Sequence, residues 1–556
     1  MKKKIFLGLS MAVAVSLAAC GGQKSADNGK QGSDATKAEG AEASDNSVLN
    51  VEIGPPQETI DPALNNAREA ANMINHTFEG LLRYDKDGNI VPAQAESYEK
   101  SDDGLTYTFH LRDGLKWSDG TDLTAKDFLY SWKRVADPAT AAPYAEELLG
   151  MVKGYKEASA GNLDALGIEA PDDKTFVIHL AYPCSYFEQI CAFAVMVPVQ
   201  EATIEANGDA WTNTAETYVS NGPYYVSAYT QDEQYVLTKN PNYWDKDNVT
   251  FETINWLLVK DSNAAYTAYN QGDLDFSRDF PKEELESVQK TADYHIDPLR
   301  GTYFMIFNCN KEPFNNPKVR AALSLALDRD YIANSIMQGL YSPATNFVGT
   351  GVSDAKEGSS FEKVTEEKYG NAFDLKGYDA QLAKAKELLA EAGYPNGEGF
   401  PAFTYSTNDT DYHKPVAEYA QDVWKKELGL NCSINILEWA SFTADRRSGN
   451  FDIARQGWLY DWDDPANMLN LLVTTNGNND GKYSSTEYDS IMDKAKTLTD
   501  KAAYYDAMHE AEQLALKDAA IAPLAYYNDT WLQKENLKNV WHHPNGFWYF
   551  MHATKE

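Results

Sequence analysis

The sequence predicts an α/β fold, and the region after residue 400 carries the main observation. Segments typical of strands and helices alternate there: AFTYST (402–407), a helix over 412–429, NCSINILEW (431–439), a helix over 440–449, and FDIARQGW (451–458). This β-α-β-α-β order is the signature of a mostly parallel sheet covered by helices. About 500 residues follow the N-terminal tract, which is too many for a single core, so we expect two or three domains.

The N-terminal tract predicts export and a tether. MKKKIFLGLSMAVAVSLAACGG has three lysines, then an apolar run too short for a comfortable membrane span, which ends at Cys20. The LAAC ending resembles a bacterial lipobox, so residues 1–20 are expected to form a lipoprotein signal peptide and Cys20 to carry lipid. An ordinary signal peptide with an incidental cysteine is the alternative. Residues 21–47 contain no aromatic side chain and are expected to form a flexible, disordered tether.

Local signals mark further elements along the chain. TYTFHL (106–111) alternates apolar and polar residues like a strand. Thr124, followed three residues later by Asp127, predicts a capping box at the start of a helix. Asn316 and Pro317 predict a second helix start. The amphipathic segment from residue 378 is expected to stop at Gly393.

Charge and motifs exclude several functions. The formal net charge of −34 argues against binding nucleic acid or an anionic membrane through basic patches. Cysteines and histidines show no zinc-site spacing, so neither metal nor cofactor is expected. No G-x-S-x-G, H-E-x-x-H or Walker lysine motif is present, which predicts that the protein is not an enzyme. Paired carboxylates acting on a sugar remain an open alternative.

The stretch GWLYDWDDPANML (457–469) is the candidate site. Its carboxylates Asp461, Asp463 and Asp464 stand among aromatic rings, where desolvation is costly unless a cation arrives. The stretch follows the last strand of the alternating region, and ligands of open α/β sheets bind outside the carboxyl ends of strands. A solvated acidic loop is the plainer interpretation. We expect Asp463 and Asp464 to be capping residues of the loop.

From about residue 50 to 555 the sequence resembles the oligopeptide-binding lipoproteins of ATP-driven importers, the family 5 extracellular solute-binding proteins. The motifs that carry the resemblance include TFEGLLRYDKDG, ESYEKSDDGLTYTFHLRDGLKWSDG, PFNNPKVRAALSLALDRDYI and RQGWLYDWDDPANMLN. The resemblance implies a periplasmic-binding-protein type II fold, with two α/β lobes joined by a hinge and an extra small lobe. The implied boundaries are 48–78, 203–300 and 529–556 for lobe I, 79–202 for the inserted lobe II, and 301–528 for lobe III. The ligand would lie between the main lobes, which close by a hinge.

The same resemblance assigns roles to individual residues. Asp461 would hold the α-ammonium of a peptide, and the main chain at Gly457 and Leu459 would pair with the peptide backbone. Three residues would meet the peptide carboxylate: Arg446, Arg455 and His413. Three aromatic residues would wall the side-chain pockets: Tyr144, Trp439 and Trp458.

Each assignment has a plainer structural alternative. Arg446 could pair with Asp445 or Asp452 on the surface, and Arg455 could belong to a buried ion pair. His413 could be a loop histidine, and the tryptophans could be core residues. The sequence also departs from the best-known enteric relatives, since Gly301 and Leu459 replace a cysteine pair and no lysine stands near Met337. The preferred peptide length therefore stays open.

The implied function is capture of oligopeptides and their delivery to the permease subunits of an ABC transporter. The protein would act as a monomer, held by its lipid on the outer face of the membrane of a Gram-positive cell. A signalling or murein peptide, a nickel complex, haem or a sugar is an alternative ligand. A surface hydrolase that uses the aspartates is the alternative from another class.

Overall fold

The computed structural model describes residues 46–410 and 412–556. The predicted signal peptide (1–20), its lipidated Cys20, and the predicted tether (21–47) except its last two residues lie outside this part of the chain. None of the helices in the described ranges combines the length and the apolarity that a membrane span requires.

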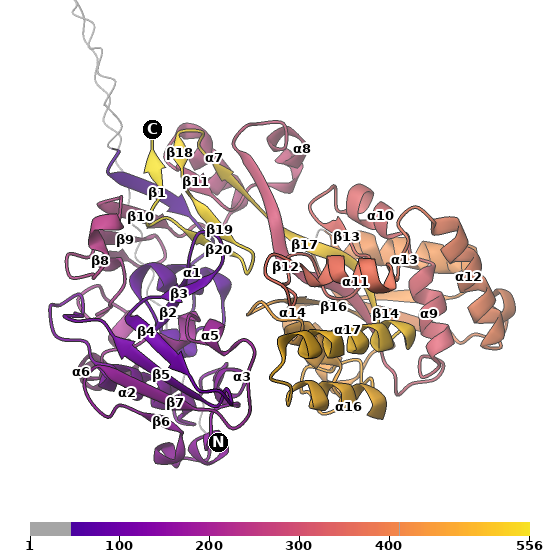
Figure 1. Ribbon diagram of the computed structural model, residues 1–556. Coiled ribbons are helices and arrows are strands. Elements are labelled where there is room, and N and C mark those ends of the chain that lie inside the picture. The colour runs from indigo at the N-terminus through magenta and orange to yellow at the C-terminus, as the bar shows by residue number, and fades with distance from the viewer. Residues whose placement is uncertain (1–45, 411) are drawn as a thin grey trace, which may run out of the picture. The chain divides into compact units, whose positions relative to one another are not determined.

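A mixed sheet of eleven strands organises the chain (Figure 1). Its path is β15-β14-β16-β12-β17-β11-β1-β10-β9-β8, and β13 adds to β17. The strands are β1 (Val48–Glu52), β8 (Tyr224–Thr230), β9 (Gln234–Lys239), β10 (Thr253–Leu257), β11 (Phe276–Ser277), β12 (Tyr294–Phe307), β13 (Ser342–Pro343), β14 (Phe403–Asn408), β15 (Cys432–Leu437), β16 (Ile453–Leu459) and β17 (Ile521–Gln533). The long strands β12 and β17 pair with each other and belong to both halves of the sheet.

The expectation of a mostly parallel sheet is correct only locally. β14 pairs parallel with both β15 and β16, as the β-α-β-α-β order predicts. β12 pairs antiparallel with β16 and with β17. The helical connections between β14, β15 and β16 bring the chain back so that these strands can pair parallel. β12 comes from a distant part of the sequence, and no such connection fixes its direction relative to β16 and β17. The sheet as a whole is therefore mixed.

Smaller sheets complete the strand inventory. A four-stranded sheet has the order β4 (Ala95–Lys100), β5 (Thr106–Leu111), β7 (Thr175–His179), β6 (Ile168–Glu169). Two-stranded pairs are β2 (Leu82–Tyr84) with β3 (Ile90–Pro92), β19 (Trp541–His543) with β20 (Phe547–Tyr549), and β18 (Leu537–Lys538) with β21 (Thr554–Lys555).

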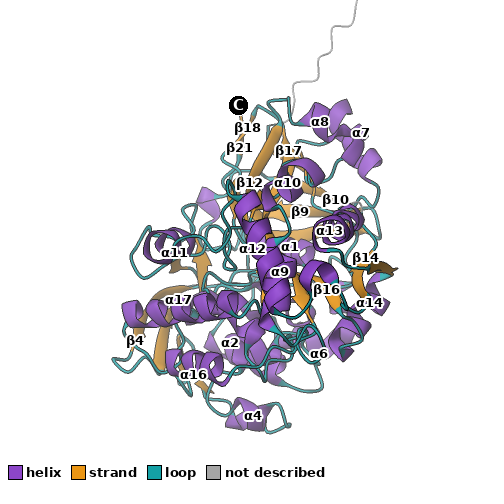
Figure 2. Cartoon of the chain, turned by 90° about the vertical axis from the view of Figure 1, so that its right-hand side faces the viewer, coloured by secondary structure: helices purple, strands orange, loops and turns teal. Residues whose placement is uncertain are grey.

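Helices cover both faces of the sheet around β12 (Figures 1 and 2). The helices are α1 (Arg68–Thr77), α2 (Ala125–Ala136), α3 (Ala145–Leu149), α4 (Tyr155–Ala158), α5 (Phe187–Ile190), α6 (Glu201–Asn207), α7 (Ser262–Gln271), α8 (Leu285–Val288), α9 (Pro317–Leu325), α10 (Arg329–Tyr331), α11 (Phe361–Tyr369), α12 (Tyr378–Glu391), α13 (His413–Leu428), α14 (Trp439–Ser448), α15 (Ala466–Leu469), α16 (Thr486–Ala495) and α17 (Lys501–Lys517). The structure confirms both helix starts that the sequence predicted. Thr124 and Asp127 form a reciprocal capping box, and Asn316 caps the helix that begins at Pro317.

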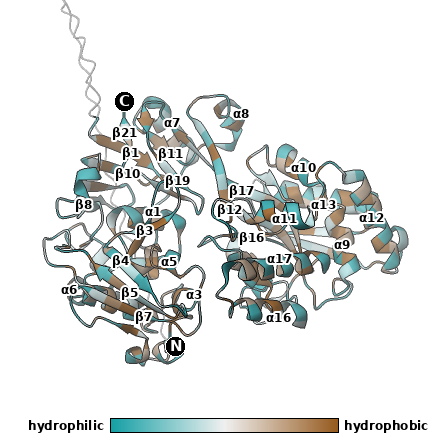
Figure 3. Ribbon diagram, viewed as in Figure 1, coloured by the Kyte–Doolittle hydropathy of each residue, from teal (hydrophilic) through white to brown (hydrophobic). Residues whose placement is uncertain are grey.

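Alternation along β12 separates two hydrophobic cores. Met305 packs with residues of α9, α12 and α13, whereas its neighbours Phe304 and Ile306 pack with residues of α14, α16 and α17. Successive side chains of a strand point to opposite faces, which gives each helical layer its own core. Hydrophilic and hydrophobic residues mix along α12 in Figure 3, as expected for a helix with one buried face.

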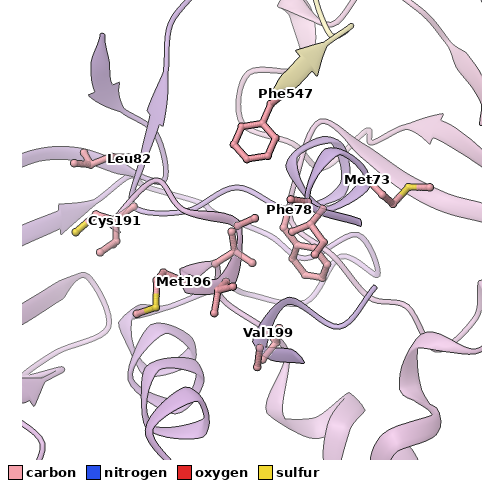
Figure 4. Close-up of a cluster of buried hydrophobic side chains, with 14 of the residues drawn as sticks. Met73, Phe78, Leu82, Cys191, Met196, Val199 and Phe547 are labelled. Atoms are coloured by element: carbon pink, nitrogen blue, oxygen red, sulfur yellow. The ribbon is translucent and has the colours of Figure 1, made fainter. Parts of the chain in front are cut away.

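A third and larger core joins segments from both ends of the described chain. It runs from Leu49 to Phe276 and takes in Phe547 and its neighbours near the C-terminus. Figure 4 shows part of it, with Met73 on α1, Phe78 directly after α1, and Phe547 on β20 from the other end of the chain. This core also takes in Trp462, which stands between residues of a β12 core, so the cores interleave along the chain. The lobe boundaries given above stay a prediction.

Candidate functional site

The far side of β16 is a strand edge that is only partly covered. β12 accompanies β16 along its whole length, from Phe307 opposite Ile453 to Gly301 opposite Leu459. On the other side, β14 pairs only with Ile453 and Ala454. Beyond Ala454, no strand of the described chain pairs with this side of β16. An exposed edge of this kind offers unpaired N–H and C=O groups to an incoming strand.

The register shows which main-chain groups face that free edge. Tyr460 N–H donates to the Arg300 carbonyl at 3.0 Å, and Asn308 N–H donates to the Asp452 carbonyl at 2.9 Å. Hydrogen-bonding residues alternate in an antiparallel ladder, so the even-numbered residues of β16 face β12. Gly457 and Leu459 therefore turn their N–H and C=O groups toward the free edge, which is the orientation that backbone pairing with a ligand needs.

Asp461 lies just beyond the end of this edge without a counter-ion. The Tyr144 hydroxyl donates to its Oδ1 at 3.1 Å. No lysine, arginine or histidine of residues 46–410 and 412–556 forms an ion pair with it. Burial, and next the negative charge of Glu147, raise the pKa of Asp461 to about 7, against the opposing effect of hydrogen bonds from Tyr144 and Asn467. A cation that binds next to this unpaired, buried carboxylate would therefore stabilise its ionised form.

Glu147 is a site residue that the sequence reasoning missed. It stands three residues after Tyr144, at the start of α3, so the two side chains share one helix face. It is partly exposed, forms no ion pair within the described chain, and its pKa is raised by burial. The spacing from Tyr144 was the available signal, but nothing in the sequence placed this helix against Asp461.

The other two aspartates of the loop have structural partners. Asp464 accepts a hydrogen bond from Ala466 N–H at 2.8 Å, which confirms the predicted cap. Asp463 is not a cap. It pairs with Arg300 at 2.9 Å and accepts hydrogen bonds from the main-chain N–H and the hydroxyl of Ser353. The prediction was wrong because these partners lie more than a hundred residues away in sequence.

Arg455 is the counterpart of Asp461, a cation without an anion. No carboxylate of the described chain pairs with it, so it is not the structural ion-pair residue of the alternative interpretation. Its Nη2 donates to the Tyr527 hydroxyl at 3.3 Å, and its guanidinium lies 5.2 Å from the ring centroid of Tyr303. Its buried Nε has no acceptor in the described chain. The guanidinium therefore retains hydrogen-bonding capacity and charge for an anion.

His413 lies beside Arg455 but carries no charge of its own at neutral pH. It is the first residue of α13, and its ring centroid is 5.4 Å from that of Tyr303. Burial, and next the positive charge of Arg455, lower its pKa to about 3. Its buried Nδ1 has no partner in the part of the chain that the structure describes. A neutral imidazole can still donate one hydrogen bond.

Arg446 differs from Arg455 because it is already paired. Its Nε lies 2.7 Å from Asp480 Oδ2; Asp480 is buried and the side chain of Arg446 is 12% exposed. Neither Asp445 nor Asp452 is its partner, since Asp445 accepts from Asn450 and Asp452 pairs with Lys311. The structure therefore pairs Arg446 with Asp480 and not with either of the two aspartates that the sequence suggested as alternative partners.

The predicted aromatic walls occupy different settings. Trp439 starts α14 with 53% of its surface exposed, so it is not a core residue. Trp458 is partly exposed, and its indole N–H donates to Asn467 Oδ1 at 2.8 Å. Tyr144 contacts the site through its hydroxyl, as described above.

A cavity of about 850 Å³ adjoins the Asp461 end of the edge. Trp458, Asp461 and Glu147 line it, whereas Gly457 and Arg455 are not among its lining residues. The cavity therefore includes Asp461 and does not reach Arg455.

Comparisons with known proteins agree in both sequence and fold. The model of the bacterial extracellular solute-binding proteins, family 5, middle region, matches residues 89–480. The oligopeptide-binding protein OppA of Bacillus subtilis is 33% identical over 100% of this chain and 99% of its own length. The periplasmic oligopeptide-binding protein OppA of Salmonella typhimurium is 34% identical over 89% of this chain and 90% of its own. The structure of Haemophilus influenzae OppA in complex with the peptide RPPGFSPFR superimposes with a TM-score of 0.73 at 29% identity, covering 92% of this chain and 99% of that one.

Proposed function

The chain belongs to the family 5 bacterial extracellular solute-binding proteins, and from that premise we propose that it captures oligopeptides and delivers them to an ATP-driven importer. The observation that carries the proposal is one free strand edge with an uncompensated anion at one end and an uncompensated cation at the other. These are the complements of an extended peptide with free termini.

A peptide of arbitrary sequence offers only three constant features, namely its backbone, its ammonium and its carboxylate. The edge at Gly457 and Leu459 meets the backbone by strand addition. Asp461 meets the ammonium, and Arg455 meets the carboxylate. Arg455 and Asp461 are six residues apart in sequence and stand at opposite ends of the free edge, so an extended ligand would run along β16 between them.

The remaining predicted residues take supporting roles in this proposal. His413 donates a neutral hydrogen bond near the carboxylate. The bond of Arg446 to Asp480 uses its Nε, so its Nη groups would be the ones to donate to the peptide carboxylate. Trp439 and Trp458 contact ligand side chains, and Tyr144 orients the carboxylate of Asp461.

The cellular setting extends the proposal. The protein acts outside the cytoplasm, as its family does. A lipid on Cys20 anchors it to the outer face of a Gram-positive membrane, and it hands its ligand to permease subunits as a monomer and without catalysis. Cys20→Ser should release the protein into the medium; a variant that remains membrane-bound without lipid would contradict the anchor.

Mass spectrometry under native conditions tests the ligand class. Protein purified from cells without denaturation should carry peptides of mixed sequence and similar length. A sugar, a haem or a nickel complex in their place would overturn the proposal. Turnover of chromogenic glycoside or peptide substrates by the purified protein would overturn the non-catalytic part.

A further inference from the structure

The cavity beyond Asp461 is much larger than an ammonium group requires. At about 850 Å³ it falls within the size range of small-molecule sites. In the proposed binding mode the ligand backbone ends at Asp461, so the side chain of its first residue is the part nearest to this cavity. The chemistry of the lining then decides which first residues are favoured.

The inner wall of the cavity carries more negative charge than one ammonium neutralises. Asp461 and Glu147 both line it, and neither forms an ion pair within the described residues. An α-ammonium at Asp461 leaves Glu147 without a cation. Burial raises the pKa of both carboxyl groups, and a second positive charge would relieve that cost.

The lysines that line the same cavity do not supply that charge. Lys100 pairs with Glu188 at 3.4 Å, and Lys496 pairs with Asp493 at 3.3 Å. Lys501 lies 5.7 Å from the ring centroid of Tyr505. All three lysines are exposed, which places their charges in water at the rim.

The wall also offers a surface for the stem of a long side chain. Trp462 stacks on Tyr186 with ring centroids 4.8 Å apart, and both residues line the cavity together with Met151. The indole N–H of Trp462, which is only 7% exposed, has no acceptor in the described chain. The methylenes of lysine or arginine pack on aromatic faces while the charged head reaches a polar partner.

We propose that this cavity receives the side chain of the first ligand residue and selects a basic one, with Glu147 as its carboxylate partner. Glu147 is then a specificity-determining residue of the site. The inference rests on the proposed function, because it needs the peptide ammonium at Asp461.

Titration calorimetry on the full chain tests the selection. Three tetrapeptides with free termini, Lys-Ala-Ala-Ala, norleucine-Ala-Ala-Ala and Glu-Ala-Ala-Ala, differ only in the first side chain. The lysine peptide should bind about tenfold more tightly than the norleucine peptide, the gain expected of a hydrogen bond to a charged group. The glutamate peptide should bind most weakly. Equal affinities, or tightest binding of the glutamate peptide, would overturn the inference.

Two neighbouring variants locate the effect. Glu147→Gln should abolish the preference, so that the lysine and norleucine peptides bind this variant equally. Glu146→Gln is the matched control, since Glu146 lines the same cavity but is exposed, and it should retain the preference. A preference lost in Glu146→Gln and kept in Glu147→Gln would contradict the assignment. If none of the peptides binds the parent, the proposed function itself fails; if norleucine binds and lysine adds nothing, only this inference does.

Discussion

Asp461 and Asp463 lie two residues apart in one loop, yet their surroundings are opposite. Asp463 meets the guanidinium of Arg300 at 2.9 Å. Asp461 meets a tyrosine hydroxyl and, nearby, the negative charge of Glu147. A paired buried carboxylate holds the fold together, whereas an unpaired one carries a cost that a ligand can remove. The loop thus separates a structural carboxylate from one that is available for binding.

Two arginines toward the other end of the free edge of β16 differ in the same way, since one is paired and the other is not. Arg446 is paired with Asp480, whereas Arg455 contacts Tyr527 and Tyr303 and pairs with no carboxylate of the described chain. Pairing, more than residue type or position, distinguishes the charges that maintain the fold from those that we assign to the ligand.

The largest expected effect is on stability. Asp463→Asn leaves Arg300 without a counter-ion and should lower the free energy of unfolding by about 3–5 kcal/mol. Asp461→Asn should leave stability at pH 8 unchanged or raise it. The folded-state pKa of Asp461 lies above its usual 3.8, so its ionised form costs stability at pH 8; that cost begins to decline as the pH falls below about 7 and is gone only near 3.8. Scanning calorimetry of both variants checks this, and equal destabilisation of the two would break the comparison.

The next effect is on affinity at the carboxylate end. Arg455→Gln should weaken a peptide with a free carboxylate by at least about 2 kcal/mol, roughly thirtyfold in Kd. A C-terminally amidated peptide should be insensitive to this change. Arg446→Gln, whose parent side chain is already paired, should weaken the free peptide far less. Titration calorimetry that finds Arg446 the more important of the two would reverse our assignment.

A smaller effect should appear with pH. Asp461 must be ionised to pair with an ammonium, and its pKa in the ligand-free protein is about 7. Below that pH, binding must displace a proton, so the affinity for an alanine-first peptide should fall about tenfold per pH unit. The peptide α-ammonium, with a pKa of about 7.7–8.0, is mostly charged below pH 7. Asp461→Asn should flatten the profile between pH 7.5 and 5.5, and a flat profile in the parent would contradict the raised pKa.

Local sequence signals predicted much of the fold. The alternation after residue 400 yielded β14, α13, β15, α14 and β16 in their observed order, and the Thr124 and Asn316 caps were found from spacing alone. The mixed character of the sheet was missed, because β12 and β17 meet across a long stretch of chain. Local patterns carry no information about such pairings.

The site was predictable only in part for the same reason. Asp461 stood out as a carboxylate among aromatic rings, and the resemblance gave it a role. The pairing of Asp463 with Arg300, of Arg446 with Asp480, and the approach of Glu147 to Asp461 are all long-range contacts. Each decides whether a charge is free, and none is visible in a local motif.

The central claim is that Asp461 pairs with the ammonium of the ligand. Calorimetry on four combinations tests it most directly: parent and Asp461→Asn, each with a free peptide and with its N-acetylated form. Asp102→Asn, an exposed acid of the same cavity, is the matched control and should bind like the parent.

Losing either partner of the buried pair should weaken binding by about 3–5 kcal/mol, roughly a hundredfold to several thousandfold in Kd. The acetylated peptide should lose little more in Asp461→Asn, because both changes remove the same interaction. Fully additive penalties, or normal binding of the free peptide by Asp461→Asn, would contradict the account.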